Sequence, residues 1–368
     1  MTERDNLTAA LEELGKVFTP TEWTTPLDLE RHRWVLGARL REGDFGPYRE
    51  PFSFPGVDQD RVAAALAAVE RESASLPAVL RRLVREHVDG IAAQVAAVVS
   101  RDDALYAAWA VEDSGLPTVK IQNAAREVLR QPEHLTDGPR ELGTRDLESA
   151  ILDALERHSV EGWRVEISAN MAAMASVNGA LRRIRVREGI ELMEREVHRL
   201  VAHEVGGHVL RWENARRQAE PLAAFPFRNT AATEEGLAAL REREQGLESA
   251  ENLRRYAVRV LGVVEAQRRG LVSLAEFLCG YLDADDAAEL ALRLRRGLAD
   301  PESHGGLTKD HGYLSGLLDL AERPVEEIRL LRATKWGVGY LDAARELLAD
   351  GKLSTGDLIE YVPSKGEG

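Results

Sequence analysis

Two histidines and a glutamate stand close together in the segment 203–208, which reads HEVGGH. Imidazole nitrogens bind zinc, and a glutamate beside them can take a proton from a metal-activated water. In the familiar zinc-peptidase pattern the histidines are four residues apart and lie about 40° apart on one helix face. His203 and His208 are five residues apart, which on a regular helix separates them by about 140°. They can hold one ion only if the helix departs from α geometry.

The pair Gly206-Gly207 supplies the backbone freedom that this departure needs. One extra residue can be absorbed as a π-bulge, a feature found often at functional sites. Two glycines in a regular helix would otherwise cost roughly 2 kcal/mol relative to alanine. We therefore predict a π-type irregularity across the motif. His198, which no acidic residue follows directly, is predicted to be a bystander.

A catalytic zinc site needs a third protein ligand and leaves its fourth position to water. Glu235 is the candidate, in the segment 233–238, which reads TEEGLA. The segment looks like the start of a helix, with Thr233 as its cap, and a carboxylate in a first turn is favoured in its ionised form by the helix dipole. An acidic residue in a first turn is also a common helix signal, so the residues alone leave this ligand open.

Alternating apolar and polar residues predict strands at 163–168 and 182–187, and 171–177 could form another. Asn178-Gly179 is typical of a tight hairpin turn, so we expect a small antiparallel sheet before the motif helix. Helical periodicity predicts two helices across 62–100, the second starting at Pro77, then one at 102–111 and one near 147–155. From Ile190 onward the chain is expected to be helical almost to its end.

These elements predict a mainly helical α+β fold. Residues 1–58 lack sustained periodicity and are interpreted as a lead-in segment. The catalytic domain is predicted to span 59–368, with a helical part at 59–160 and the sheet and zinc-binding core at 161–368.

Composition excludes several classes of protein. A chain of 368 residues with 44% hydrophobic and 30% charged residues is globular, and its net charge of -14 disfavours nucleic acid and anionic membranes as partners. The single cysteine, Cys279, excludes an internal disulfide and lies in an apolar stretch, where a buried thiol is expected. No signal peptide or membrane span is evident, so we expect a cytoplasmic protein. The oligomeric state is left open.

The sequence resembles the bacterial proteins named for a QEGLA motif as flavohaemoglobin expression modulators, together with the eukaryotic microtubule-associated tyrosine carboxypeptidases. The resemblance spans roughly residues 50 to 360 and rests on the segments 203–208, 214–216, 234–238 and 306–310, followed by Tyr313-Leu314 and Gly316. It implies a zincin-like metallopeptidase in which His203, His208 and Glu235 bind Zn²⁺ and Glu204 is catalytic. Position 234 holds glutamate where the bacterial name expects glutamine.

The predicted function is zinc-dependent removal of a C-terminal residue, such as tyrosine or another aromatic, from a peptide or protein. A free carboxylate requires a cation, and the resemblance brings the candidates Lys309 and Arg296 near the cleft. Tyr313, one turn after Lys309, could donate a hydrogen bond to the oxyanion. The strand at 171–177 could pair with an extended substrate.

Two alternatives remain at this point. Two histidines and a carboxylate also describe the ligands of non-haem iron oxygenases, although that chemistry gives Glu204 no evident role. The second alternative is a regulatory protein whose zinc site is structural or has no catalytic role, although structural zinc sites usually have four protein ligands.

Overall fold

The computed structural model describes residues 3–132 and 138–364. Up to residue 192 the elements are α1 (Glu3–Val17), α2 (Pro20–Thr24), α3 (Leu29–Glu42), α4 (Gln59–Glu72), α5 (Ala78–Ser100), α6 (Asp103–Ser114), α7 (Val119–Arg130), β1 (Leu142–Gly143), α8 (Thr144–Arg157), β2 (Arg164–Ser168), β3 (Ala175–Asn178), β4 (Arg183–Arg187) and β5 (Glu191–Leu192). The remaining elements are α9 (Glu194–Val201), the π-helix η1 (Ala202–Val209), α10 (Leu210–Arg216), η2 (Pro221–Ala224), α11 (Ala231–Glu244), α12 (Ala250–Ala266), α13 (Leu271–Leu278), α14 (Ala284–Leu294), η3 (Lys309–His311), α15 (Gly312–Ala321), α16 (Val325–Arg332), η4 (Val338–Tyr340) and α17 (Leu341–Ala349).

The chain is predominantly helical with small sheets, as predicted. None of its described helices is both long and apolar enough to span a membrane. The helices predicted across 62–100 are α4 and α5, and Pro77 directly precedes α5. The helices predicted at 102–111 and 147–155 correspond to α6 and α8.

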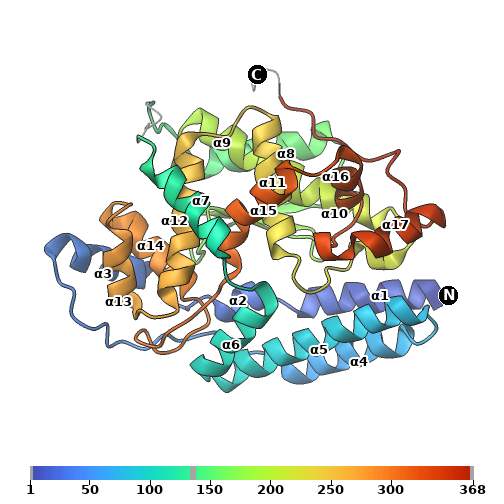
Figure 1. Cartoon of the computed structure of the whole chain (residues 1–368), viewed down its shortest axis with the longest axis horizontal. Helices are drawn as coiled ribbons and strands as arrows, with labels where there is room; N and C mark the ends of the chain where they lie inside the picture. Colours follow the sequence, from blue (N-terminus) through green and yellow to red (C-terminus); the bar gives the residue numbers. More distant parts are fainter. Residues whose placement is uncertain (1–2, 133–137, 365–368) are drawn as a thin grey trace.

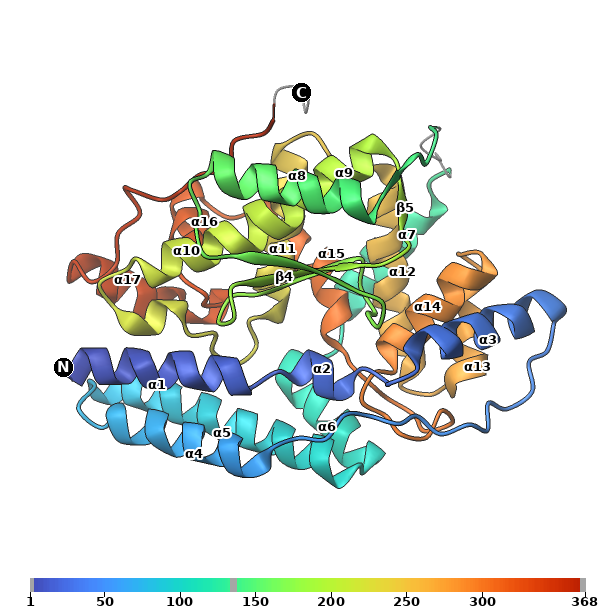
Figure 2. The ribbon, with the colours of Figure 1, turned by 180° about the vertical axis from the view of Figure 1, so that it is seen from behind.

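The N-terminal segment is the first departure from the sequence prediction. Residues 1–58 were expected to lack periodic structure, but they contain α1, α2 and α3. Leu7 and Leu14 of α1 are buried in the same apolar core as Val62 and Val69 of α4. The two helices lie side by side in the lower layer of the molecule, together with α5 (Figures 1 and 2). The prolines and aromatics that follow α1 obscured its short apolar stripe. The domain boundary at residue 58 stays a prediction.

The larger sheet is mixed and not antiparallel throughout. Its strand order is β2-β4-β3, in which β2 pairs with β4 in parallel and β3 pairs with β4 antiparallel. β3 is shorter than the predicted strand at 171–177 and lies in the connection that carries the chain from β2 across to β4. A parallel pair requires such a crossover, which strand patterning alone does not reveal. A separate antiparallel pair, β1 with β5, was not predicted.

The predicted two-residue turn at Asn178-Gly179 is also wrong. β3 ends at Asn178 and β4 begins at Arg183, so the connection is longer, and Arg182 has a φ of 44°. The side chain of Asn178 accepts a hydrogen bond from the backbone N–H of Leu181. Gly179 has a packing role, because a Cβ there would lie 2.3 Å from the indole of Trp212.

One face of the sheet forms a core with the helices around it. Ile184 and Val186 of β4 are fully buried, and α8 supplies Leu147 and Ile151 to the same cluster. The alternation along β4 leaves its arginines on the other face. In Figure 2, α8 and α9 lie above the sheet and α1 lies below it. This core holds α9, which continues directly into the motif helix.

Helix α11 is packed closely between η1 and α15. A Cβ at Gly207 of η1 would lie 2.5 Å from the Cβ of Ala238, and one at Gly316 of α15 would lie 1.8 Å from the carbonyl oxygen of Ala232. The glycines therefore let three helix backbones approach one another. This contact fixes the distance between the motif helix and the segment that carries Glu235.

Cys279 was predicted to be buried, but it is exposed. It directly follows the last residue of α13, whose inward positions are Leu271, Leu274 and Leu278. One further residue turns the side chain by about 100° around the helix axis and away from the core.

Candidate active site

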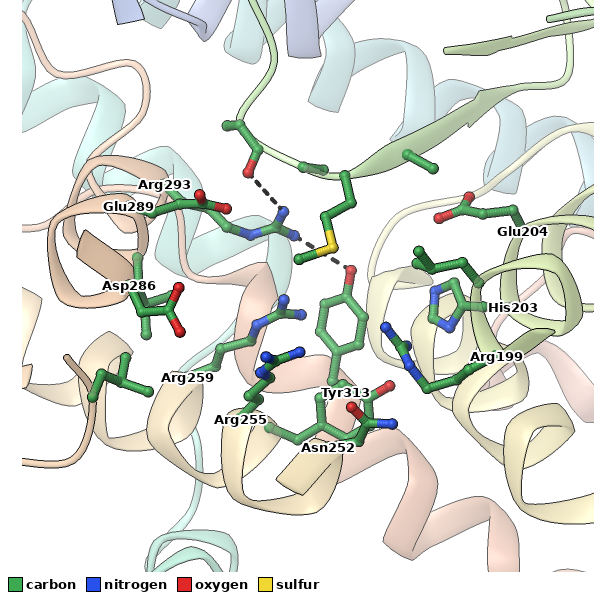
Figure 3. Close-up of a pocket in the computed structure, with 18 residues that line it drawn as sticks. Arg199, His203, Glu204, Asn252, Arg255, Arg259, Asp286, Glu289, Arg293 and Tyr313 are labelled. Carbon is green, nitrogen blue, oxygen red and sulfur yellow. Dashed lines mark hydrogen bonds between the residues drawn. The ribbon is translucent and has the colours of Figure 1, made fainter. Parts of the chain in front are cut away.

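The motif 203–208 lies within a π-helix, as the five-residue spacing predicted. Hydrogen bonds of the i to i+5 type bring residues five apart onto one face. The rings of His203 and His208 accordingly lie with their centroids 5.0 Å apart. Figure 3 shows His203 and Glu204 on this helix, beside a pocket.

Glu235 completes a group of three possible ligands. Its Oε2 lies 3.6 Å from Nε2 of His203 and 3.8 Å from Nε2 of His208. In a tetrahedral zinc site with bonds of about 2.0–2.1 Å, neighbouring ligand atoms are about 3.3 Å apart. The same Oε2 is buried and has no hydrogen-bond partner among the described residues. Among those residues, these three form the group whose ligand atoms lie close enough to share one ion, and His198 is not part of it.

The helical context of Glu235 differs from the prediction. Helix α11 begins at Ala231, so Glu235 lies in its second turn, and no side chain caps the helix. Thr233, the predicted cap, accepts a hydrogen bond from the backbone N–H of Val338. Burial by itself would raise the pKa of Glu235, but the neighbouring His203, His208 and Lys309 lower it well below its usual range. Local charges and not the helix dipole keep this carboxylate ionised.

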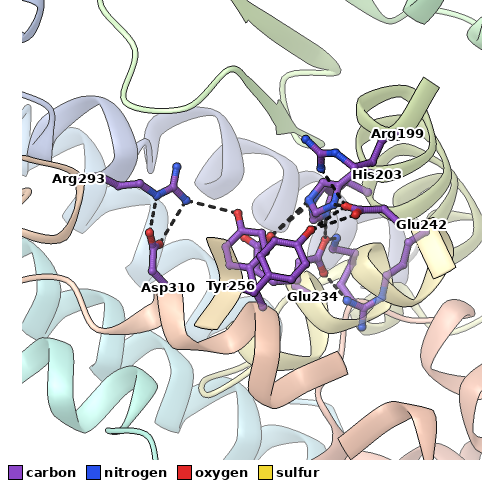
Figure 4. Close-up of polar contacts among 12 residues, drawn as sticks. Arg199, His203, Glu234, Glu242, Tyr256, Arg293 and Asp310 are labelled. Atoms are coloured by element: carbon purple, nitrogen blue, oxygen red, sulfur yellow. Dashed lines mark hydrogen bonds and ion pairs between the residues drawn. The ribbon is translucent and has the colours of Figure 1, made fainter. Parts of the chain in front are cut away.

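Two further carboxylates of α11 hold the histidine rings (Figure 4). Glu242 accepts a hydrogen bond of 2.6 Å from Nδ1 of His203, and Glu234 accepts one of 2.8 Å from Nδ1 of His208. With Nδ1 as the donor, Nε2 of each ring is left to bind a metal, and histidine ligands in zinc sites almost always have such a partner.

Both outer carboxylates are themselves held by cations. Glu242 is 1% exposed at its side chain and pairs with Arg199 at 3.2 Å, and Tyr256 donates a hydrogen bond to it at 2.9 Å. Glu234 forms ion pairs with Arg211 and Lys335. A glutamine at position 234 would offer one acceptor oxygen in place of two and no charge, so glutamate suits these two cations better.

The charges around His203 favour a cation at this place. Burial alone would lower the pKa of His203, whereas Glu235 and Glu242 raise it to about 10. A proton or a metal ion at Nε2 is stabilised by the same carboxylates. The donor set, its spacing and its charge therefore all suit a divalent cation.

The three ligands line a cavity of about 1040 Å³, here called the main cavity, together with Glu204 and the residues of β3. Glu204 is 6% exposed and lies next to His203 in the chain. β3 is one of the two edge strands of its sheet, so within the described residues one side of its backbone is not paired with another strand. The main cavity thus combines a metal-binding group, a carboxylate and an open strand edge.

Tyr313 also lines the main cavity, at the start of α15. Its ring stacks on that of His203 with centroids 5.9 Å apart, and its hydroxyl accepts a hydrogen bond of 3.3 Å from Arg293. Burial raises the pKa of Tyr313 far above its usual value, so the hydroxyl keeps its proton. It can therefore donate to an oxygen in the cavity.

The predicted cations Lys309 and Arg296 lie in the wall of the main cavity as well. Neither has an ion-pair partner within the described part of the chain, and Nε of Arg296 is buried without a hydrogen-bond partner. Burial lowers the pKa of both groups, and Glu235 acts against this at Lys309. Arg293, by contrast, is neutralised by a bidentate ion pair with Asp310.

A smaller pocket of about 150 Å³, here called the side pocket, shares His203, Glu204 and Tyr313 with the main cavity. Its other walls include Tyr256. They also include Asn252, Arg255, Arg259 and Asp286, which are labelled in Figure 3. All of these come from α12 and α14, which the sequence did not connect with the site.

Sequence reasoning brought together seven residues that the structure does place around one cavity. It missed Glu242, although this residue follows Glu235 by seven positions and so lies two turns further on the same helix face. It also missed Arg293, whose partner Asp310 is 17 residues away and belongs to another element. No spacing rule would have found that pair.

The model of the microtubule-associated tyrosine carboxypeptidase family matches residues 51–364 of the chain. The chain belongs to this family. Microtubule-associated tyrosine carboxypeptidase 1 from Homo sapiens is 34% identical over 127 residues, which amount to 32% of this chain and 26% of the human protein. The chain thus matches about a quarter of the length of this relative. Helices α1–α3 precede the match to the family model.

Proposed function

We propose that this chain is a zinc-dependent carboxypeptidase that removes a residue from the C-terminus of a peptide or protein. The proposal rests mainly on Oε2 of Glu235, which is buried and has no hydrogen-bond partner among the described residues. This atom lies 3.6 Å from Nε2 of His203 and 3.8 Å from Nε2 of His208. The Nδ1 atoms of both rings donate hydrogen bonds to other carboxylates. The family name points to the same class of reaction. Tyrosine, which the names of the family and its human member contain, is the first leaving residue to test.

His203, His208 and Glu235 would hold the ion. When bound, zinc supplies an acidified water and polarises the scissile carbonyl. Glu204 accepts the proton of that water and transfers it to the departing amine. The hydroxyl of Tyr313 donates a hydrogen bond to the oxygen on which negative charge develops. Arg293 orients this hydroxyl from behind, because it donates to the same oxygen atom.

Selection of a free C-terminus is assigned to the two cations of the cavity wall that form no ion pair within the described residues. Lys309 and Arg296 bind the terminal carboxylate, which adds a hydrogen-bonded counter-charge to two cations whose pKa values are lowered by burial. The substrate backbone upstream of the scissile bond lies along the edge strand β3, as in other strand-addition complexes. The substrate is therefore a peptide segment with an extended, accessible end.

The test uses purified, zinc-loaded protein and a mixed library of free-acid peptides together with their amidated counterparts. Mass spectrometry of the products is expected to show loss of single C-terminal residues from the free acids only. Glu204→Gln should bind zinc with unchanged stoichiometry and show no turnover. Turnover by Glu204→Gln would refute the role of Glu204, and equal cleavage of amidated peptides would refute the carboxypeptidase assignment.

A further inference from the structure

Helix α1 forms one wall of the main cavity, although it precedes the residues that the family model matches. Two neighbouring faces of this helix have different surroundings. Leu7 and Leu14 are buried in the apolar core that α1 shares with α4. Thr8, Leu11 and Gly15 are half-buried and line the main cavity. Their spacing of three and four residues puts these three on one helix face.

Across the main cavity from α1 lie β3 and the connection that follows it (Figure 2). Ala175, the first residue of β3, also lines the side pocket together with His203 and Glu204. The start of β3 therefore lies near the metal-binding group. Beyond the other end of β3 the chain touches α1, because a Cβ at Gly15 would lie 2.4 Å from the Cβ of Ala180. The strand thus leads from the metal-binding group to α1.

Helix α1 is held in place from two sides of the main cavity. On one side its apolar face is buried against α4, and Glu13 pairs with Arg61 of that helix at 2.9 Å. The exposed ion pair contributes little, so the apolar contact dominates. On the other side Glu22 of α2, the next helix, pairs with Arg183 and Arg185 of β4. The segment is therefore tied to the helical layer and to the sheet, and α1 is a fixed wall.

A substrate that extends along β3 from the metal-binding group would reach α1 with its upstream residues. β3 has four residues, and an extended chain rises about 3.3 Å per residue, so α1 is reached about four residues before the scissile bond. We infer that the cavity face of α1 binds the substrate segment upstream of the scissile bond. This inference rests on the proposed function, since it concerns the same substrate. The partner is an unfolded chain end of at least about five residues, held between a strand edge and a helix.

The experiment compares an octapeptide with a tripeptide that has the same last three residues. Glu12 and Lys16 are exposed and also line the main cavity, so a larger side chain there obstructs the cavity without disturbing the core. In Glu12→Trp the ratio of kcat/KM for the octapeptide to kcat/KM for the tripeptide should fall at least fivefold, because only the longer peptide reaches α1. Lys16→Trp, one turn further along the helix, should have the same effect.

Ala9→Trp is the matched control, since Ala9 is exposed on the same helix and is not among the described residues that line the main cavity. It should leave the ratio within a factor of two. A ratio that stays unchanged in both Glu12→Trp and Lys16→Trp overturns the inference. A fall of the same size in Ala9→Trp also overturns it, because the effect would then not depend on the cavity face.

A second measurement separates this inference from the proposed function. Binding of the same two peptides to zinc-loaded Glu204→Gln is measured by calorimetry, with and without Glu12→Trp. The octapeptide should bind at least tenfold more tightly than the tripeptide, and Glu12→Trp should remove most of this difference. That result supports the inference even if the wild type cleaves nothing and the proposed function fails. Equal affinity for the two peptides, or no binding of the octapeptide, overturns it.

Discussion

Replacement of Glu242 by glutamine tests whether the carboxylate behind His203 is part of the metal site. Glu242 is almost fully buried and accepts hydrogen bonds from His203, Arg199 and Tyr256. Loss of such an outer carboxylate typically weakens metal binding by about 10–100-fold. At free zinc equal to 100 times the wild-type Kd, the ion stabilises the native state by about 2.7 kcal/mol, and a 100-fold weaker site retains only about 0.4 kcal/mol.

The assay is urea denaturation of the zinc-free and zinc-loaded forms, combined with zinc competition against a chromophoric chelator. The zinc-free variant should itself lose about 3–5 kcal/mol, because Arg199 is left in the interior without its counter-charge. A double variant, Arg199→Met with Glu242→Gln, removes both charges and should recover part of that loss while zinc binding stays weak. The difference between the zinc-loaded and zinc-free stabilities isolates the effect on the metal site.

Glu244→Gln is the matched control, since Glu244 lies on the same helix and pairs with Arg332 away from the histidines. It should leave the Kd for zinc within a factor of two. If Glu242→Gln also leaves the Kd within a factor of two, the argument that Glu242 prepares Nε2 of His203 for a metal is wrong.

Two further predictions concern packing and exposure. Gly207→Ala should destabilise the protein by about 1–3 kcal/mol in urea denaturation, because the added Cβ would lie 2.5 Å from that of Ala238. Gly246→Ala is the control: Gly246 has a positive φ of 67° and open space around it, so this substitution tests backbone strain alone. Equal losses in the two variants would contradict the close-packing role. Cys279 should react with a thiol reagent in the native protein at a rate close to that in urea, and protection by more than tenfold would contradict its exposure.

The residues of the candidate site could be predicted from the sequence more completely than the surrounding fold. A five-residue spacing is incompatible with chelation on a regular helix, so taking His203 and His208 as ligands of one ion predicted a π-type irregularity there. The strand patterning around Ile184 and Val186 was equally clear, because burial alternates along β4. These features depend on residues close together in the chain, where period and spacing determine which side chains share a face.

What could not be predicted depends on contacts between distant segments. The parallel pairing of β2 with β4 is decided by the path of the chain between them, and the role of α1 by its packing on α4. The ion pair of Arg293 with Asp310 is of the same kind. It forms because the fold brings α14 against η3, and a sequence with 62 acidic residues gives no indication of which one will lie beside a given arginine.

Helix α11 explains how one element can organise the whole metal site. Glu235 and Glu242 are seven residues apart and therefore project from one face, toward His203, while Glu234 is turned toward His208. The helix backbone is held against η1 at Gly207 and against α15 at Gly316. A shift of α11 would thus displace a ligand and both outer carboxylates together, so the close packing at the two glycines determines the geometry of the site as directly as the ligands do.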